Sequence, residues 1–146
     1  MSKRVEALTI RVARPDERDE LEELQRRASL ALPEYREQLL AHPNAIHLPS
    51  AQVANGQVIV AEIDGRTVGF AAVVGGELDG LFVEPDLWRR GIGAALVDAA
   101  THQARRKGLA LTVIANPAAR EFYENCGFSL EGEAQTRFGR ALRMSR

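Results

Sequence analysis

The segment WRRGIGAALVDAA, residues 88–100, constrains this chain most because it places two arginines and two glycines at the start of a helix. The first N–H groups of a helix have no partner within it and carry a partial positive charge. Gly91 and Gly93 let a ligand approach the backbone, and Arg89 and Arg90 add cationic donors at the same point. The segment therefore predicts an anion cradle suited to a ligand with several phosphate oxygens.

The residues that follow the cradle are typical of a packed amphipathic helix. Its apolar residues recur at spacings of three and four and so share one buried face: Ile92, Ala95, Leu96, Ala99 and Ala100. Basic residues at 105–107 complement the negative end of the helix, and Gly108 ends it. A glycine-rich turn can simply begin a helix, but two arginines at the positive end are unfavourable without a ligand. We therefore favour phosphate binding.

Two other phosphate-binding loops are excluded by spacing. The Walker loop, GxxxxGK followed by Ser or Thr, does not occur in the chain. The dinucleotide fingerprint requires a third glycine where this chain has Leu96, and an acidic residue where it has the apolar run at 109–115.

The arrangement resembles motif A of the GNAT superfamily of acyl-CoA N-acyltransferases, in which a strand and a short connection precede Gln or Arg, two residues, Gly, one residue, and Gly or Ala. The match covers residues 78–96. The second signature of the family, an Asn before a short helix with an Ala, a Tyr and then Gly-Phe, is similar to NPAAREFYENCGF at 116–128. One departure is Trp88, which stands where the family commonly has Gln or Arg.

Composition predicts one small soluble enzyme domain over residues 1–146. A hydrophobic content of 45% leaves room for a core, and a formal net charge of −1 gives no reason to expect nucleic acid or an anionic membrane as a partner. No apolar run approaches 18 residues and the start MSKRVEA is polar, so we expect a cytoplasmic protein. A lone cysteine, Cys126, excludes an intramolecular disulfide, and the three histidines lack metal-ligand spacing, so no metal is expected.

The order of elements follows from hydrophobic period and turn residues. We predict strands at 7–13, 57–63, 67–74, 77–83, 109–115, 128–131 and 138–144. We predict helices from Pro15, from Pro33 to before Pro43, across the motif, and from Pro117 to Gly127, with 42–56 as a loop. Asp64-Gly65 predicts a hairpin, and the apolar run at 109–115 predicts a strand buried on both faces and paired in parallel. This is the order of the α+β GNAT fold: a mixed, mostly antiparallel central sheet flanked by helices, with a parallel strand pair at the cofactor cleft.

The resemblance implies an enzyme that transfers an acetyl group from acetyl-CoA to a primary amine. Backbone N–H groups of Leu81, Phe82 and Val83 are expected to hold the acyl carbonyl and the pantetheine amides, which add to the sheet as a pseudo-strand. The pyrophosphate is expected at Arg89, Arg90, Gly91, Ile92, Gly93 and Ala94. Asn116 and Ala119 match positions near the cofactor in the family, although helix capping and packing also explain them.

Three side chains are candidates for the chemistry. Tyr123 matches the Tyr of the second signature and is expected to protonate the departing thiolate, although a Tyr on a short amphipathic helix is often a core residue. Glu77 and Asp79, two residues apart on one strand, share a face and are candidate bases. A water relay is the alternative to either carboxylate.

The acceptor is not named by any pattern in the sequence. In the family its pocket is formed by the first two helices, their loop and the terminal hairpin, which here points to Glu34, Tyr35, His47, Thr136, Arg137 and Phe138. Arg137 suits a substrate carboxylate and Glu34 an amine, but both also suit a solvated surface. The partner is therefore a small-molecule or peptide amine, and a homodimer is compatible with the domain size. Two alternatives remain open: a non-catalytic acyl-CoA-binding sensor, and a nucleotide-binding protein that uses the cradle for another phosphate ligand.

Overall fold

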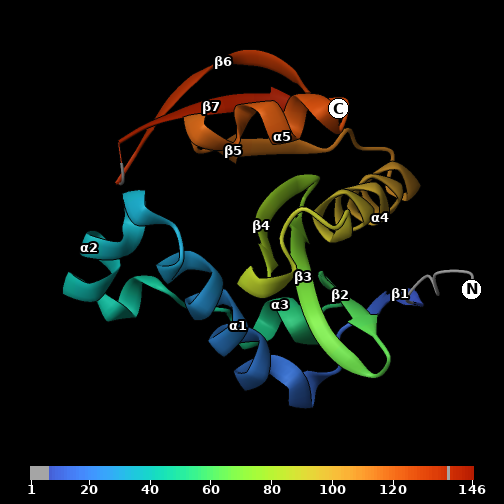
Figure 1. Ribbon diagram of the computed structural model, residues 1–146. Helices are drawn as coiled ribbons and strands as arrows, with labels where there is room; N and C mark the ends of the chain where they lie inside the picture. The colour runs from blue at the N-terminus through green and yellow to red at the C-terminus, as the bar shows by residue number, and fades with distance from the viewer. Residues whose placement is uncertain (1–6, 138) are drawn as a thin grey trace, which may run out of the picture.

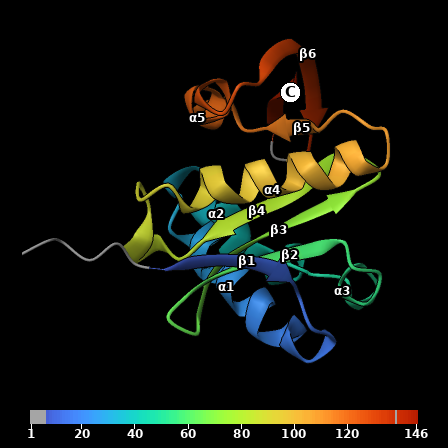
Figure 2. The same cartoon turned by 90° about the vertical axis from the view of Figure 1, so that its right-hand side faces the viewer.

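A computed structural model describes residues 7–137 and 139–146, in which a seven-stranded sheet is flanked by helices on both faces (Figures 1 and 2). The strands are β1 (Leu8–Val12), β2 (Val58–Ile63), β3 (Arg66–Val74), β4 (Glu77–Val83), β5 (Thr112–Ala115), β6 (Ser129–Thr136) and β7 (Gly139–Ser145). The α-helices are α1 (Arg18–Leu30), α2 (Pro33–Ala41), α3 (Ser50–Ala54), α4 (Ile92–Arg106) and α5 (Arg120–Asn125). Short 3-10 helices are η1 (Pro15–Glu17), η2 (Pro43–Ala45), η3 (Pro85–Leu87) and η4 (Pro117–Ala119).

The sheet has the order β1-β2-β3-β4-β5-β7-β6. Strands β4 and β5 are parallel, and the other neighbouring strands are antiparallel. The predicted mixed sheet with a parallel pair after β4 is confirmed. The hairpin expected at Asp64-Gly65 joins β2 to β3.

Two apolar layers cover the faces of strands β1 to β4. On β2, Val58 and Val60 face a layer shared with α1 and α3, whereas Ile59 and Ala61 face the layer that contains α4. Alternate residues of a strand point to opposite faces. When helices cover both faces, the sequence of the strand is therefore a continuous run of apolar residues. Figure 2 shows α4 on one side of these strands and α1 on the other.

The segment at 42–56 was predicted as a loop, and this prediction was wrong. It contains η2 and α3, and the side chains of Ile46, Leu48 and Val53 are buried. Val53 and Leu48 complete the apolar layer beneath α1. The loop was predicted because the segment contains two prolines and two asparagines. These residues are common in loops, but they also occur at the first positions of helices.

The ends of three predicted strands also differ in the structure. Strand β6 extends to Thr136 because it pairs with β7 along its length, although its side chains are mostly exposed and give no apolar signal. Strand β5 begins only at Thr112, and Leu109 is 40% exposed. Of β5, Val113 and Ala115 are buried and the other two residues are half-buried, so it is not fully covered on both faces. The strand predicted from Phe138 is described from Gly139, and Phe138 itself lies outside the described residues.

A cluster of charges fixes β1 to the start of α1. The buried Glu17 carboxylate accepts hydrogen bonds from Arg11 Nη1 and Nη2, at 2.8 and 2.7 Å, and from the Arg14 backbone N–H at 2.7 Å. The hydrogen bonds from Arg11 are the main reason that the pKa of Glu17 falls to about 2, against the opposing effect of burial.

This arrangement predicts an acid-sensitive contribution to stability. A carboxyl with a lowered folded-state pKa stabilises the protein above its unfolded pKa and loses that contribution as the pH falls toward the folded value. The free energy of unfolding of the native protein should therefore fall between about pH 5 and pH 2 more steeply than that of Glu17→Gln. Urea denaturation at pH 6 and pH 3 measures this difference. Asp19→Asn, at a side chain that is 93% exposed, is the control. An unchanged pH dependence in Glu17→Gln would contradict the prediction.

Candidate active site

Strands β4 and β5 pair only briefly and then separate. The register joins Glu77 to Thr112 and Leu78 to Val113, whereas β4 continues to Val83. On the β3 side the register skips Asp79, which makes a β-bulge that bends β4. Among the described residues no strand pairs with β4 at 79–83 on the side of β5, so this segment forms an open edge. Figure 1 shows the two strands running apart, with β5 beside β7.

The backbone groups at this open edge come from alternate residues. The N–H of Glu84 donates to the carbonyl of Val68 at 2.9 Å, which directs the backbone groups of every second residue of β4 toward β3. Leu81 and Val83 therefore direct their N–H and C=O groups away from β3. Phe82 directs its backbone toward β3, and its ring packs against Phe70 with centroids 5.3 Å apart. Three residues of β4 were predicted to hold the cofactor through their backbone groups. Only Leu81 and Val83 present those groups at the open edge, because alternate residues of a strand face opposite sides.

The phosphate cradle, residues 89–94, lies just beyond β4 and η3. A helix begins among the glycines, as the sequence predicts: α4 begins at Ile92, and its N-cap is Gly91, which has a left-handed φ of 84°. Arg89 also has a positive φ, 67°, a conformation that costs a non-glycine residue about 1–2 kcal/mol. Arg89, Arg90 and Gly91 are exposed, whereas the side chain of Ile92 packs into the core. The exposed N–H groups and guanidinium groups at this point suit an anion.

Gly93 and Ala94 differ from the rest of the cradle in being half-buried. A Cβ at Gly93 would lie 3.2 Å from Cζ of Phe122, so the helix start approaches α5 closely. This contact joins the first signature to the second.

A half-buried ion pair holds the end of β4 against α1. Arg27 Nε and Nη2 donate to the two carboxylate oxygens of Glu84 at 3.0 and 2.9 Å. The Glu84 side chain is only 11% exposed, and a second guanidinium, that of Arg66, lies 3.7 Å away. Bidentate pairs of this kind fix geometry as well as charge. No sequence pattern predicts this pair, since the two partners are 57 residues apart.

Tyr123 lies on α5 in the apolar layer of α4. Its ring packs edge-on against Phe122 and Phe128, with centroids 5.0 and 5.2 Å apart. Only 8% of the residue is exposed, and this burial raises the pKa of its phenol. A phenol with a raised pKa keeps its proton at neutral pH, which is the state required of an acid.

The two candidate bases lie on the other face of β4 from Leu78. Glu77 and Asp79 are both exposed, whereas Leu78 between them is buried in the layer of α4. Asp79 accepts a hydrogen bond from Gln52 Nε2 of α3 at 3.2 Å. Both carboxylates are therefore accessible. Asp79, however, is hydrogen-bonded on the α3 side of the sheet, whereas Tyr123 lies on the α4 side.

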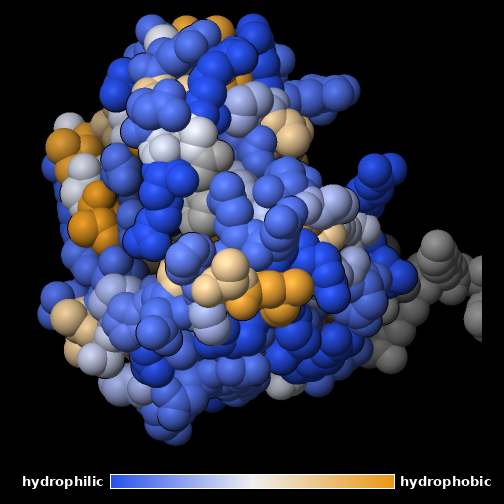
Figure 3. All heavy atoms as spheres, turned by 90° about the vertical axis from the view of Figure 1, so that its left-hand side faces the viewer, coloured by the Kyte–Doolittle hydropathy of each residue, from blue (hydrophilic) through white to orange (hydrophobic). Residues whose placement is uncertain are grey.

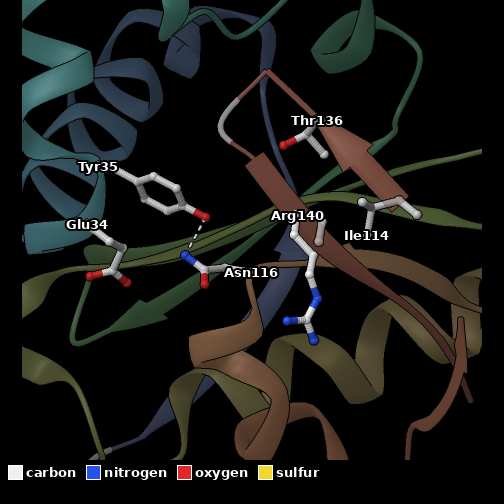
Figure 4. Close-up of a pocket in the computed structure, with 7 residues that line it drawn as sticks. Glu34, Tyr35, Ile114, Asn116, Thr136 and Arg140 are labelled. Atoms are coloured by element: carbon white, nitrogen blue, oxygen red, sulfur yellow. Dashed lines mark hydrogen bonds between the residues drawn. The ribbon is translucent and has the colours of Figure 1, made fainter. Parts of the chain in front are cut away.

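A pocket of about 280 Å³ lies between α2 and strands β5 to β7 (Figure 4). It is lined by Glu34, Tyr35, Ile114, Asn116, Thr136, Arg140 and Ala141. Three of the predicted acceptor residues are among them: Glu34, Tyr35 and Thr136. His47 is not, because its ring lies 3.4 Å from Glu22 on α1. Arg137 is exposed and does not line the pocket, and Phe138 lies outside the described residues.

The sequence missed Ile114, Arg140 and Ala141 as lining residues. Ile114 alternates with the buried Val113 and Ala115, so strand period was the one signal that pointed to its face. Arg140 pairs in register with Gln135 across the terminal hairpin, and its Nε lies 3.2 Å from Glu133. In Figure 4, Glu34 and Arg140 lie on opposite sides of Asn116.

Asn116 joins the two sides of this pocket. Its Nδ2 donates to the Tyr35 hydroxyl at 2.6 Å, and its Oδ1 accepts from the Ala118 backbone N–H at 2.8 Å. The predicted cap is confirmed, and the same side chain also reaches α2, as Figure 4 shows. Burial is the main reason that the pKa of Tyr35 is raised, while the hydrogen bond from Asn116 opposes that shift. Ala119 is half-buried against the core.

The face that includes α2 is mostly hydrophilic, with scattered apolar groups (Figure 3). In the described part of the chain, helices are too short or too polar to cross a membrane. Within residues 7–137 and 139–146, no group of three His, Cys, Asp or Glu side chains is placed to hold a metal ion.

Comparison with known proteins identifies the family. The acetyltransferase (GNAT) domain matches residues 54–130, about half of the chain. The chain belongs to the GNAT acetyltransferase family, as the two signatures predict.

The chain is 40% identical over 82 residues to the peptidyl-lysine N-acetyltransferase YiaC of Escherichia coli, a match that covers 55% of each chain. The chain spans about half the length, or less, of the curated relatives it matches.

Solved structures share the fold over nearly the whole chain. A GCN5-related N-acetyltransferase from Rhodopseudomonas palustris is 25% identical with a TM-score of 0.76, covering 100% of this chain and 98% of that one. The PaiA N-acetyltransferase of Thermoplasma acidophilum, solved in complex with coenzyme A, is 19% identical with a TM-score of 0.73, covering 96% and 99%. The match to PaiA shows the fold alone.

The link between Tyr35 and Asn116 is testable by a double-mutant cycle. Tyr35→Phe and Asn116→Ala should each lower the free energy of unfolding, measured by urea denaturation. The double variant should lose less than the sum of the two by about 0.5–1.5 kcal/mol, the net value of one hydrogen bond. The cycle cancels the separate loss of the helix cap in Asn116→Ala. Strict additivity would show that the hydrogen bond does not stabilise the fold.

Proposed function

We propose that this protein transfers an acetyl group from acetyl-CoA to a primary amine. The observation that carries the proposal is the succession of two features along the chain: the open edge of β4 ends at Val83, and the cradle follows after η3 and Trp88, at the start of α4. A ligand with an amide-containing arm and a pyrophosphate at its end fits both features at once. Membership of the GNAT family and the coenzyme A bound to the similar fold of PaiA support the same ligand.

Each part of acetyl-CoA has a proposed partner. The pantetheine amides pair with the backbone groups of Leu81 and Val83, which face away from β3. The pyrophosphate accepts from the N–H groups at the start of α4, with Arg89 and Arg90 beside it. Asn116 and Ala119, which follow the end of β5, are the proposed cofactor contacts from the second signature.

The proposed reaction needs one acid and one base. The neutral amine attacks the thioester carbonyl, a C–N bond forms, the C–S bond breaks, and the carbonyl oxygen is stabilised by backbone N–H donors of the edge. Tyr123 gives its proton to the departing thiolate, and its raised pKa keeps that proton in place beforehand. The proton lost by the amine nitrogen goes to Glu77, to Asp79 or to water.

The acceptor amine is proposed to enter through the pocket beside Tyr35. Glu34 places a carboxylate there, which attracts a cationic amine, and Arg140 places a guanidinium across Asn116 from it. YiaC, which matches half of the chain, is named as a peptidyl-lysine N-acetyltransferase. The proposed acceptor is a primary amine, either the side chain of a peptide lysine or a small-molecule amine.

Cofactor binding is tested by comparing two glycine variants. Gly91 and Gly108 both have positive φ and open space for a side chain, so Gly91→Glu and Gly108→Glu carry the same backbone cost at opposite ends of α4. Only Gly91→Glu places a carboxylate at the cradle. Calorimetric titration with acetyl-CoA should show an affinity at least about tenfold lower for Gly91→Glu, equivalent to about 1.4 kcal/mol, and native affinity for Gly108→Glu. Equal affinities would exclude the cradle as the phosphate site.

The acid role is tested with Tyr123→Phe, which keeps the ring and removes the hydroxyl. The variant should bind acetyl-CoA with native affinity while kcat for amine acetylation falls by about 100-fold or more, the range for loss of a general acid. Release of free CoA thiol in the presence of a panel of peptide and small-molecule amines measures the rate. If kcat of Tyr123→Phe equals that of the native protein, Tyr123 is not the acid and its role is limited to packing in the core. Acetyl-CoA binding without transfer to any amine would favour a non-catalytic sensor.

A further inference from the structure

The lone tryptophan of the chain contacts the open edge of β4 directly. Trp88 Nε1 donates a hydrogen bond to the carbonyl of Val83 at 2.8 Å. The residue follows η3 and precedes the cradle, and 39% of it is exposed.

The carbonyl that Trp88 occupies is one of the few groups available to an added strand. The hydrogen bond from Glu84 to Val68 sets the alternation, so Leu81 and Val83 supply the carbonyls that face away from β3. A segment that pairs with a strand edge uses both the N–H and the C=O of such residues. An indole that donates to the Val83 carbonyl stands at that edge itself, where the added segment would lie.

The open edge of β4 has a partner from within the chain in the free protein. Trp88 supplies a donor to the Val83 carbonyl at an exposed position, where water is the competing partner while no ligand is bound.

We propose that Trp88 covers the open edge in the free protein and is displaced from the Val83 carbonyl by the pantetheine arm of the cofactor. The inference rests on the proposed function, since it requires a ligand that extends along β4. Trp88 is thereby a residue that sets cofactor affinity, because binding exchanges its hydrogen bond for one from a pantetheine amide. Ligands that occupy only the cradle leave it in place.

Two ligands separate these steps. Acetyl-CoA reaches both the cradle and the edge, whereas adenosine 3′,5′-bisphosphate lacks the pantetheine arm and reaches only the cradle. Trp88→Phe keeps a ring and removes the N–H donor. It should bind acetyl-CoA about two- to tenfold more tightly than the native protein, the value of one net hydrogen bond, and bind the bisphosphate unchanged. Titration calorimetry measures both affinities.

The native protein provides a second readout that needs no variant. Because Trp88 is the sole tryptophan, its indole N–H gives a single nitrogen-15 resonance and the only tryptophan fluorescence. Acetyl-CoA should shift that resonance, speed its hydrogen exchange and change the emission, while the bisphosphate should leave the exchange rate unchanged.

The outcomes distinguish the two proposals. Failure of the native protein to bind acetyl-CoA would overturn the proposed function. Binding of acetyl-CoA with the indole N–H still protected would overturn the displacement of Trp88 and leave the proposed function intact. Weaker binding of both ligands by Trp88→Phe would likewise overturn it, and would make Trp88 a residue that positions the cradle.

Discussion

The structure depends on one strand edge that the sheet leaves unpaired. Backbone N–H and C=O groups require partners, yet β4 pairs with β5 only at Glu77 and Leu78 and then bends away at the Asp79 bulge. The groups of Leu81 and Val83 are therefore directed to an indole, to solvent or to a ligand. The other features of the site follow the path of this strand. The cradle lies beyond η3 and Trp88 after the end of β4, and the pocket beside Tyr35 is lined by β5, the strand from which β4 separates.

Two contacts between distant segments fix the walls around this edge. The Arg27–Glu84 ion pair ties the end of β4 to α1, and the hydrogen bond between Tyr35 and Asn116 ties α2 to the end of β5. The Glu84 side chain is buried, and those of Tyr35 and Asn116 are half-buried, so both contacts are partly shielded from water. A site held by such contacts can accept a ligand with little rearrangement of the backbone, which lowers the entropic cost of binding.

Prediction succeeded where the signal was local and failed where it was not. The start of α4 at Gly91 and the hairpin at Asp64-Gly65 each follow from a few adjacent residues whose backbone preferences are strong. Helix α3 was missed because its five residues gain their stability from Val53 in the apolar layer, not from helix propensity. The length of β6 was missed because hydrogen bonds to β7 define it and its side chains remain exposed.

The sequence by itself determined the family, the order of the strands and the start of α4 among its glycines, because these depend on short-range spacing of glycines, apolar residues and caps. The tertiary structure decided which backbone groups of β4 face away from β3, which residues line the pocket beside Tyr35, and that Trp88 reaches Val83. Strand register, a bulge and the separation of β4 from β5 set those relations, and each joins residues through space in a way that no periodicity along the chain encodes.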